Sequence, residues 1–441
     1  MAIRKMAAVG AMGIATVLAL SACSGSAGAG GNAGAPGDGK VPDVDGKGQT
    51  LTVWVMQNDY TEETLAAINE EFTAQTGAEV TIQSQTWDGI TTKLTTALAT
   101  DTPPDVVDVG NTQIASYAAT GGLLDLTPYK EDLAQGQTWL DGLVDPATID
   151  GDLFGVPGFA GARAVIYNKK MWAEAGVTAA PTTFDELTAS LDKVKAANAQ
   201  TPDFSAFYLP GQYFYAGMQF VWDAGGDIAT NDDGEWKSGF SSDEGIEGLK
   251  AFQAFQNEYS TAASATLDTF EPNQSQLFAD GKTAAILNTN TGAILKINPD
   301  LEADLGTFPL PGISGEAQPV MLGGSDWAVP VKSKNSDLAL NWVKIATSPD
   351  IQQDYVYGVD GWIPNSVEGI EFAQESVDEL RSSFFTAALR SKATPANANW
   401  TTIESNKAIN SLFAVIASGS KSVEDAAKDF DADADKTLNI E

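Results

Sequence analysis

The chain has 441 residues, with 25 basic and 59 acidic side chains and a formal net charge of −34. The electrostatic field of so large a negative charge repels nucleic acid and anionic lipid, so neither is an expected partner. Histidine is absent, which excludes zinc sites and catalytic triads built on imidazole. Paired carboxylates remain available for catalysis. Because acidic residues are so abundant, some pairs of carboxylates lie close by chance, and such a pair does little to distinguish an enzyme from a protein without catalytic activity. We expect neither a metal nor a cofactor.

The N-terminus predicts export. Arg4 and Lys5 precede an apolar run over 6–20, and the tetrapeptide LSAC closes it at Cys23. This order of charge, apolar core and small-residue exit indicates a signal peptide over 1–22. The run is shorter than the ~20 residues that a bilayer span needs, and no second long run follows. We therefore expect no transmembrane helix in the mature chain.

The LSAC tetrapeptide resembles the lipobox of bacterial lipoproteins, in which the cysteine becomes the lipidated first residue. Cys23 is the only cysteine, so an internal disulfide and thiol chemistry are excluded. A chance cysteine at an ordinary signal-peptide exit is the alternative. Residues 23–48 are rich in Gly, Ala and Ser and predict a flexible tether after the lipidated cysteine. The predicted location is extracytoplasmic, with the chain lipid-anchored to the outer face of the cell membrane.

The body of the chain opens with alternating strands and helices. Strand-forming runs lie at 51–56, 79–83 and 104–109. Between them, a first helix is predicted from a cap at Thr61 to a stop at Gly77, and a second helix spans residues 90–98. This alternation predicts an α/β fold with a parallel sheet. About 390 residues follow the tether, more than one core usually organises, so we expect two domains.

Polar and aromatic residues follow each of these three strands. Ligands of open parallel sheets bind beyond the carboxyl ends of the strands, so we expect these side chains to meet at one rim. They are Asn58, Asp59, Trp87, Asp88, Asn111, Thr112 and Gln113. For Asn58, Asp59 and Asp88, turn formation and helix capping are equal alternatives to ligand contact.

The remainder of the body continues the mixture. A strand is predicted at 164–167, helices at 184–196 and 246–255, and an apolar segment at 217–222. The C-terminal third is helical, with apolar residues at helical spacing. Trp222 and Trp342 fall inside elements and are expected to pack.

An alternating run of acidic residues lies near the C-terminus, at Asp429, Asp431, Asp433 and Asp435. The run lacks the glycine and the closing glutamate of a calcium-binding loop. We therefore predict a solvated helix end rather than a metal site.

At several places in order, the chain resembles the extracellular (family 1) solute-binding proteins of carbohydrate ABC importers, to which maltose-binding protein belongs. The matching stretches are PDVVDVGNTQIASYAATGGLLDL, GVPGFAGARAVIYNKKMW, FVWDAGGD, LFADGKTAAILNTNTG, MLGGSDWAVP and GWIPNS. They run from about Leu51 to Glu424. The resemblance implies a two-lobed periplasmic-binding-protein-like fold of type II. Each lobe would be a mostly parallel sheet flanked by helices, with three hinge crossings between the lobes.

The resemblance also implies boundaries and a function. The crossings would lie near 157–163, 319–324 and 360–364. Lobe 1 would then contain 49–160 plus 322–360, and lobe 2 would contain 161–321 plus 361–441. The implied function is capture of a sugar, in particular an oligosaccharide, outside the cell. Closure of the lobes would be followed by delivery to the membrane permease subunits of an ABC importer. We expect a monomer that is not an enzyme.

Further binding residues are carried over from the resemblance. They are Arg163, Tyr213, Tyr215, Gly324, Ser325, Asp326 and Trp400, and Trp362 joins them because it lies at a predicted element end. Flat aromatic rings suit the apolar faces of a sugar, while amides, carboxylates and guanidinium suit its hydroxyl groups. Arg163 has an equal alternative role, that of pinning a carboxylate at a crossing. Relatives place an aromatic near Thr291, where this chain has none, so the stacking surface there is smaller or has moved.

Two alternative functions remain open. One is a secreted glycoside hydrolase that uses two carboxylates, including Asp59 or Asp326. The other is a binding protein of the same fold for a different solute, such as a polyamine. The acidic charge favours a polyamine, whereas the aromatic and amide rim favours a neutral polyol.

Overall fold

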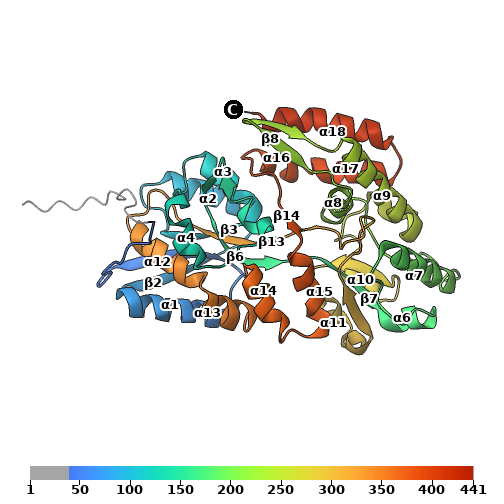
Figure 1. Cartoon of the computed structure of the whole chain (residues 1–441), viewed down its shortest axis with the longest axis horizontal. Helices are drawn as coiled ribbons and strands as arrows, with labels where there is room; N and C mark the ends of the chain where they lie inside the picture. The colour runs from blue at the N-terminus through green and yellow to red at the C-terminus, as the bar shows by residue number, and fades with distance from the viewer. Residues whose placement is uncertain (1–38, 441) are drawn as a thin grey trace, which may run out of the picture. The chain divides into compact units, whose positions relative to one another are not determined.

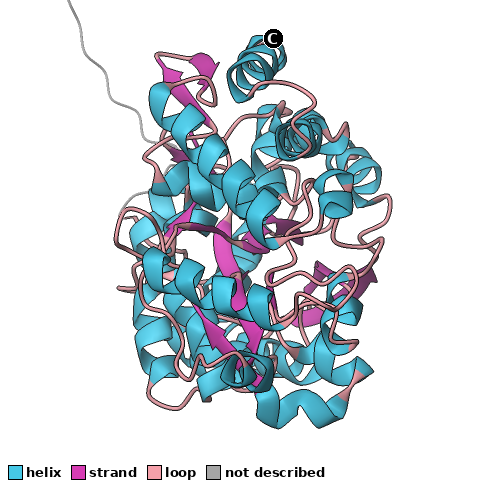
Figure 2. Cartoon of the chain, turned by 90° about the vertical axis from the view of Figure 1, so that its right-hand side faces the viewer, coloured by secondary structure: helices cyan, strands magenta, loops and turns pink. Residues whose placement is uncertain are grey.

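The fold is described from a computed structural model that places residues 39–440. The predicted signal peptide, Cys23 and most of the tether lie outside these residues. The described chain builds two main sheets, of five and three strands, together with three two-stranded pairs, and each main sheet has its own helices (Figure 1). Figure 2 shows most of the strands lying inside a surrounding layer of helices. Within residues 39–440, no helix combines the length and the apolar character needed to cross a bilayer.

The first sheet has five strands in the order β2-β1-β3-β13-β6. β1 pairs in parallel with β2 and β3, whereas β13 runs antiparallel to both of its neighbours. The strands are β1 (Thr50–Met56), β2 (Glu79–Gln85), β3 (Val106–Gly110), β6 (Val156–Gly161) and β13 (Gly323–Ala328). The associated elements are α1 (Glu62–Thr76), α2 (Ile90–Ala99), α3 (Ile114–Ala119), α4 (Lys130–Ala134), α5 (Asp141–Val144), α12 (Ser336–Ala346) and α13 (Pro349–Ile351), with a ribbon of β4 (Thr148–Ile149) and β5 (Asp152–Leu153).

Local sequence signals set the first helix as predicted. The side chain of Thr61 accepts a hydrogen bond from the backbone N–H of Thr64, which caps the first turn of α1. Gly77 ends the helix in a left-handed conformation, with φ of 73°. Ile68 and Phe72 lie on the buried face of α1 and join a first hydrophobic core that also holds Trp342.

The second sheet has three strands in the order β10-β7-β11, and both pairings are antiparallel. The prediction of a mostly parallel sheet in each lobe is therefore wrong for this sheet. β10 and β11 run in the same direction and are joined through α11, and β7 fills the space between them in the reverse direction. A strand that pairs antiparallel with its neighbour needs no helical crossover to reach it. The sequence of β7 therefore does not indicate in which direction this strand runs.

The second sheet is covered by helices from two parts of the chain. Its strands are β7 (Ala164–Asn168), β10 (Ala285–Asn288) and β11 (Leu305–Phe308). The associated elements are α6 (Lys169–Glu174), α7 (Phe184–Ala197), α8 (Phe214–Asp223), α9 (Asp243–Tyr259), α10 (Gln274–Ala279), α11 (Gly292–Ile297), α16 (Trp400–Ser405), α17 (Ala408–Ala417) and α18 (Val423–Leu438), with a hairpin of β8 (Ala229–Asp232) and β9 (Glu235–Ser238). A second hydrophobic core forms among them and contains Trp222, which packs as predicted.

Three stretches connect the two sheets. The chain leaves the first sheet between β6 and β7 and returns to it between β11 and β13. The third stretch contains Ile363, which exchanges backbone hydrogen bonds with Ala160 of β6. Beside these stretches, a short parallel pair of β12 (Val320–Met321) and β14 (Ser391–Lys392), together with α14 (Val367–Gln374) and α15 (Glu379–Ala388), completes the fold. The lobe boundaries given above stay a prediction.

The acidic run near the C-terminus lies on α18, and part of it is structural. The Asp431 side chain is only 7% exposed and accepts hydrogen bonds from the backbone N–H groups of Phe240 (3.2 Å) and Ser241 (2.7 Å). Asp433, by contrast, is exposed and pairs with Lys436 on its own helix. The prediction of a solvated helix end is therefore wrong for Asp431, whose carboxylate fastens α18 to the turn after β9.

We predict that Asp431→Ala lowers the free energy of unfolding by about 2 kcal/mol, because the buried N–H of Phe240 and the partly buried N–H of Ser241 lose a charged acceptor. Asp433→Ala is the matched control on the same helix and should change stability by less than about 0.5 kcal/mol, since exposed ion pairs contribute little. Urea denaturation of both variants and the unsubstituted protein makes the comparison. Equal effects of the two substitutions would contradict the structural role of Asp431.

Candidate functional site

Two adjoining cavities form the candidate site. The first has a volume of about 690 Å³ and is lined by residues that follow β3 and by residues of α8, α16 and α17, so elements of both cores contribute. The second has a volume of about 340 Å³ and lies among α8, β10, α10 and α11. The cavities share Gln212, Phe214, Tyr215, Asp268, Phe270 and Asn410. We call this pair of cavities the groove. Volumes of this size are usual for small-molecule sites.

Five of the predicted binding residues line the groove. Thr112 and Gln113 lie in the first cavity, Arg163 and Tyr213 lie in the second, and Tyr215 lies in both. The structure therefore brings residues from the end of β3 close to residues of α8, which are about a hundred positions away in the chain.

Arg163 is held by a network in the wall of the second cavity. Its Nε donates to the hydroxyl of Tyr213 at 3.0 Å, and one terminal nitrogen donates to the carbonyl oxygen of Met321 at 3.3 Å. Its guanidinium also lies over the ring of Tyr215, 4.1 Å from the centroid. Arg163 thus touches a crossing segment through a main-chain carbonyl rather than a carboxylate, and part of its guanidinium faces the cavity.

Besides Asp59, four predicted residues that do not line the groove are buried in this conformation. Asn111 is 4% exposed and donates to the carbonyl oxygens of Gly142 and Leu322. Ser325, Asp326 and Trp400 are each at most 1% exposed. Such side chains reach no ligand in the groove unless the protein rearranges, and here they act as its framework.

The backbone conformation at position 324 favours glycine. Its φ of 149° is a conformation that other residues rarely adopt. A Cβ at this position would collide with the carbonyl oxygen of Phe159 on the neighbouring strand. Gly324 is therefore needed for the close approach of β13 to β6.

Three buried carboxylates lie beneath the ends of the first-sheet strands. Asp59 accepts a hydrogen bond from Ser325 Oγ at 2.9 Å, but burial raises its pKa to about 6. Burial raises the pKa of Asp108 well above its usual range, and the negative charge of Asp59 raises it further. Burial and the charge of Asp108 do the same for the pKa of Asp326. Neither Asp59 nor Asp326 lines the groove.

The remaining predicted residues lie near the strand ends but line neither cavity of the groove. Asn58 is exposed in a left-handed turn with φ of 71°, and Asp88 is exposed. Trp87 is 43% exposed and lies against Gly110 at the end of β3. Trp362 donates from its indole N–H to the carbonyl oxygen of Asp59 at 2.7 Å and stacks on Phe159 with centroids 4.7 Å apart.

Phe270 is a groove residue that sequence reasoning missed. Its side chain is 73% exposed, the most exposed large hydrophobic side chain among residues 39–440. The carboxylate of Asp268 accepts hydrogen bonds from the backbone N–H groups of Phe270 (2.8 Å) and Glu271 (3.1 Å), which fixes the loop. Asn288 and Thr289 line the same cavity, in the stretch where an aromatic was expected. The only sequence signal was this missing aromatic, which indicated a displaced surface but not its new position.

Glu404 is a second missed residue. It lies on α16 in the wall of the first cavity, and burial raises its pKa to about 7. The indole N–H of Trp400 and the hydroxyl of Thr112 oppose this rise because both favour the ionised carboxylate. The indole N–H nevertheless falls short of hydrogen-bond geometry. Glu404 and Thr112 thus approach each other from different cores.

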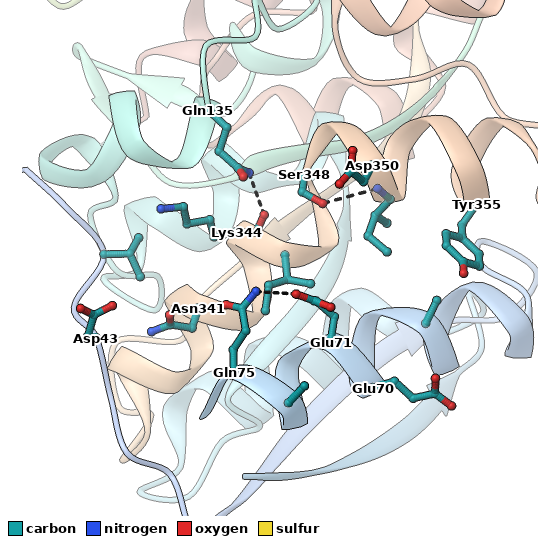
Figure 3. Close-up of a pocket in the computed structure, with 15 residues that line it drawn as sticks. Asp43, Glu70, Glu71, Gln75, Gln135, Asn341, Lys344, Ser348, Asp350 and Tyr355 are labelled. Atoms are coloured by element: carbon teal, nitrogen blue, oxygen red, sulfur yellow. Dashed lines mark hydrogen bonds between the residues drawn. The ribbon is translucent and has the colours of Figure 1, made fainter. Parts of the chain in front are cut away.

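A third cavity, of about 720 Å³, lies elsewhere and contains none of the predicted residues. Figure 3 shows it between α1, α12 and α13, with the chain at Asp43 along one side. Its polar groups are partly used among themselves, as when Gln75 donates to Glu71 at 2.7 Å. Asn341 in its wall donates to the carbonyl oxygen of Pro42 at 2.8 Å. Across the described residues, no group of three or more acidic, cysteine or histidine side chains is placed to hold a metal ion.

Comparison with known proteins places the chain in a family. The profile of the family described as "Bacterial extracellular solute-binding protein" matches residues 58–353. The chain is 34% identical to the diacetylchitobiose binding protein of Streptomyces coelicolor, over 98% of this chain and 99% of that one.

Solved structures agree in fold. The sugar-binding protein MalE of Xanthomonas citri superposes with a TM-score of 0.76 at 24% identity, covering 88% of this chain and 97% of that one. MalE of Listeria monocytogenes in complex with maltose superposes with a TM-score of 0.73 at 19% identity, covering 89% and 99%. The fold is thus the two-lobed type II periplasmic-binding-protein fold, and the chain belongs to the bacterial extracellular solute-binding proteins.

Proposed function

We propose that this protein captures a neutral oligosaccharide outside the cell and delivers it, unaltered, to the permease of an ABC importer. The observation that carries the proposal is the groove, where the exposed ring of Phe270 and the half-buried ring of Tyr215 lie together with the amide side chains of Gln113, Gln212 and Asn410. The name of the Streptomyces coelicolor relative makes diacetylchitobiose the first ligand to test. The predicted lipid anchor at Cys23 would hold a monomer at the outer face of the membrane.

The chemistry of the groove suits a sugar. A pyranose ring has apolar C–H faces and a rim of hydroxyl groups that both donate and accept hydrogen bonds. Phe270, which is 73% exposed, offers a flat surface for such a face. Phe214 and Tyr215 pack on each other in the wall beside it, with their centroids 3.9 Å apart. Gln113, Gln212 and Asn410 offer groups that donate and accept. The carboxyl groups of Asp268 and Glu404 also line the first cavity. The carboxylate of Asp268 is engaged by the backbone N–H groups of Phe270 and Glu271, which favours capture over hydrolysis.

Closure would bring the two lobes together over the ligand. Under the proposed boundaries, Thr112 belongs to lobe 1 and Glu404 to lobe 2, and both line the first cavity. Hinge closure about a few crossing segments is a known way for two domains to enclose a solute. The three crossings are candidate hinges, and the Thr112–Glu404 approach is where the lobes would meet beside the sugar.

We expect purified protein to be stabilised by diacetylchitobiose or a related oligosaccharide, with a melting temperature that rises with ligand concentration because only the folded state binds. Calorimetry then gives the affinity, and an assay for new reducing ends tests for hydrolysis. Sustained release of reducing ends would favour the glycoside hydrolase alternative. Stabilisation by a polyamine such as spermidine, but by no sugar, would favour the other alternative.

We predict that Phe270→Ala weakens sugar binding by about tenfold or more, equivalent to about 1.4 kcal/mol, because an aromatic stacking surface is lost. Phe270→Tyr should keep most of the affinity. Phe372→Ala on α14 is the matched control, since Phe372 is also a well exposed phenylalanine, at 40%, but lies outside the groove. Calorimetry on the three variants makes the comparison, and unchanged affinity in Phe270→Ala would remove this residue from the site.

We predict that Glu404→Gln removes the free-energy cost of ionising a buried carboxyl group in the folded state, a cost that grows as the pH rises. Because burial raises the pKa of Glu404 to about 7, the folded protein keeps a proton that the unfolded chain loses near pH 4.5, and stability falls as pH rises between these values. Above pH 7 the variant should be more stable than the unsubstituted protein by about 3 kcal/mol, and at pH 4 the two should be nearly equal.

The measurement is urea denaturation of both proteins at several values between pH 4 and pH 8. Glu375→Gln, at an exposed carboxyl, is the control and should show no such trend. A constant difference between Glu404→Gln and the unsubstituted protein across this range would contradict the prediction.

A further inference from the structure

One acidic side chain of the groove lies where the two cores meet. Glu404, on α16, lines the first cavity opposite Thr112, which follows β3 of the first sheet. Glu404 is only half-buried, and its carboxyl oxygens are not among the fully covered, unpaired polar atoms of residues 39–440. A ligand that fills the first cavity can therefore touch this carboxyl group.

The charged groups that line the groove near Glu404 leave its charge without a partner. Among residues 39–440, no ion pair includes Glu404. Asp268 is bonded to the backbone of its own loop, and Lys407 is exposed after the end of α16. Burial raises the pKa of Tyr215, so this phenol is neutral. Arg163 lies over the ring of Tyr215, 4.1 Å from the centroid.

The elements that pack against α16 add no partner either. α17 and the two helices that follow β3 contain no charged residue. On α18, Asp431 and Asp435 accept hydrogen bonds from backbone N–H groups next to β9, and Asp433 pairs with Lys436. The other charged side chains of α18 are exposed; they are Glu424, Asp425, Lys428 and Asp429.

A ligand in the cavity changes the balance between the two protonation states of Glu404. Burial already raises the pKa of Glu404 to about 7, against the opposing effects of Trp400 and Thr112, and no charged side chain is among the causes. Removing water from a carboxylate costs more free energy than removing it from a neutral carboxyl group. A neutral ligand that displaces the remaining water therefore favours the neutral form further.

The neutral form also suits a sugar by its hydrogen bonds. A neutral carboxyl group has one O–H donor and can also accept, as a sugar hydroxyl group can. An ionised carboxylate accepts only, and it attracts cations. The protonation state of Glu404 in the complex thus distinguishes a neutral ligand from a cationic one.

We propose that Glu404 is a specificity-determining residue that contacts the sugar as a neutral carboxyl group, so that capture takes up one proton from the medium and weakens as the medium becomes alkaline. The inference rests on the proposed function, since it concerns the same groove and the same ligand. The proton forms an O–H bond on Glu404, and no bond of the sugar changes. A cationic ligand would reverse the sign, because the carboxyl group would lose its proton and binding would strengthen as the pH rises.

The test is calorimetry at pH 7 in phosphate and in Tris, two buffers whose heats of ionisation differ widely. The probe is whichever of diacetylchitobiose and maltose raises the melting temperature more. The heats should indicate uptake of about half a proton per sugar, because about half of the free molecules have already bound it at pH 7. The affinity at pH 8 should be at least about fivefold weaker than at pH 6.

Glu404→Gln isolates the contribution of this carboxyl group. The amide has the same shape and does not ionise, so the variant should give equal heats in the two buffers and equal affinities at pH 6 and pH 8. Glu375→Gln, at an exposed position, is the control and should keep the proton uptake of the unsubstituted protein.

Thr112→Val is a second variant, which leaves Glu404 in place. The hydroxyl group of Thr112 favours the ionised carboxylate, so its removal should raise the pKa of Glu404 and move the fall in affinity to a higher pH. This shift is measured within the variant and does not depend on its absolute affinity. An unshifted fall would count against the inference.

The outcomes separate the two proposals. Sugar binding without proton uptake, or uptake that survives in Glu404→Gln, overturns the role of the neutral carboxyl group and leaves the proposed function intact. Proton release, with affinity that rises with pH, also overturns it. If neither sugar binds the unsubstituted protein, the proposed function itself fails, and this inference fails with it.

Discussion

The return of β13 into the first sheet is the constraint on which the rest of this structure depends. After the chain has built the second sheet, β13 inserts antiparallel between β3 and β6 and ties the two halves of the polypeptide together. The insertion is close because Gly324 has no side chain to meet Phe159. It brings Ser325 to within hydrogen-bonding distance of Asp59. The same strand buries Asp326 beside Asp108, so the rim of the first sheet contains carboxylates whose charged forms are disfavoured.

The groove depends on this arrangement but takes its chemistry from the second half of the chain. Residues that follow β3 supply one wall, and α8, α16, α17 and the Phe270 loop supply most of the others. One hydrogen-bonded series, from Arg163 through Tyr213 to the carbonyl oxygen of Leu287 and back to Gln274, orders the second cavity. Side chains fixed in this way can distinguish ligands that differ by one functional group, because misplaced groups would leave buried atoms unpaired.

Local signals in the sequence predicted much of the fold. The cap at Thr61 and the stop at Gly77 bound α1 as expected, because both act within one helical turn. The predicted strand direction was wrong in the second sheet, because the hydrophobic pattern gives no information on whether β7 runs parallel or antiparallel to its neighbours. The prediction of a solvated helix end was wrong for Asp431, because the backbone N–H groups that it binds, those of Phe240 and Ser241, lie about 190 positions earlier in the chain.

The candidate site was harder to predict than the fold for the same reason. The polar strand ends were found by position, but which of them face the groove depends on tertiary packing. Thr112 and Gln113 line it, whereas the adjacent Asn111 turns inward to bond Gly142 and Leu322. Phe270 escaped notice because nothing local distinguishes an aromatic at a loop tip from one that packs.

The hydrogen bond from Asn341 to Pro42 has a mechanical consequence. Together with the bond from the backbone N–H of Val41 to Asp132, it fastens the start of the described chain to α12 and α4, which pack in the first core. Any force applied through the N-terminus is therefore borne by that core. The second core is joined to the first by the crossing segments and by a third hydrophobic cluster that contains Leu143, Ala160 and Ile286, so a load on the N-terminal end reaches it only through those contacts.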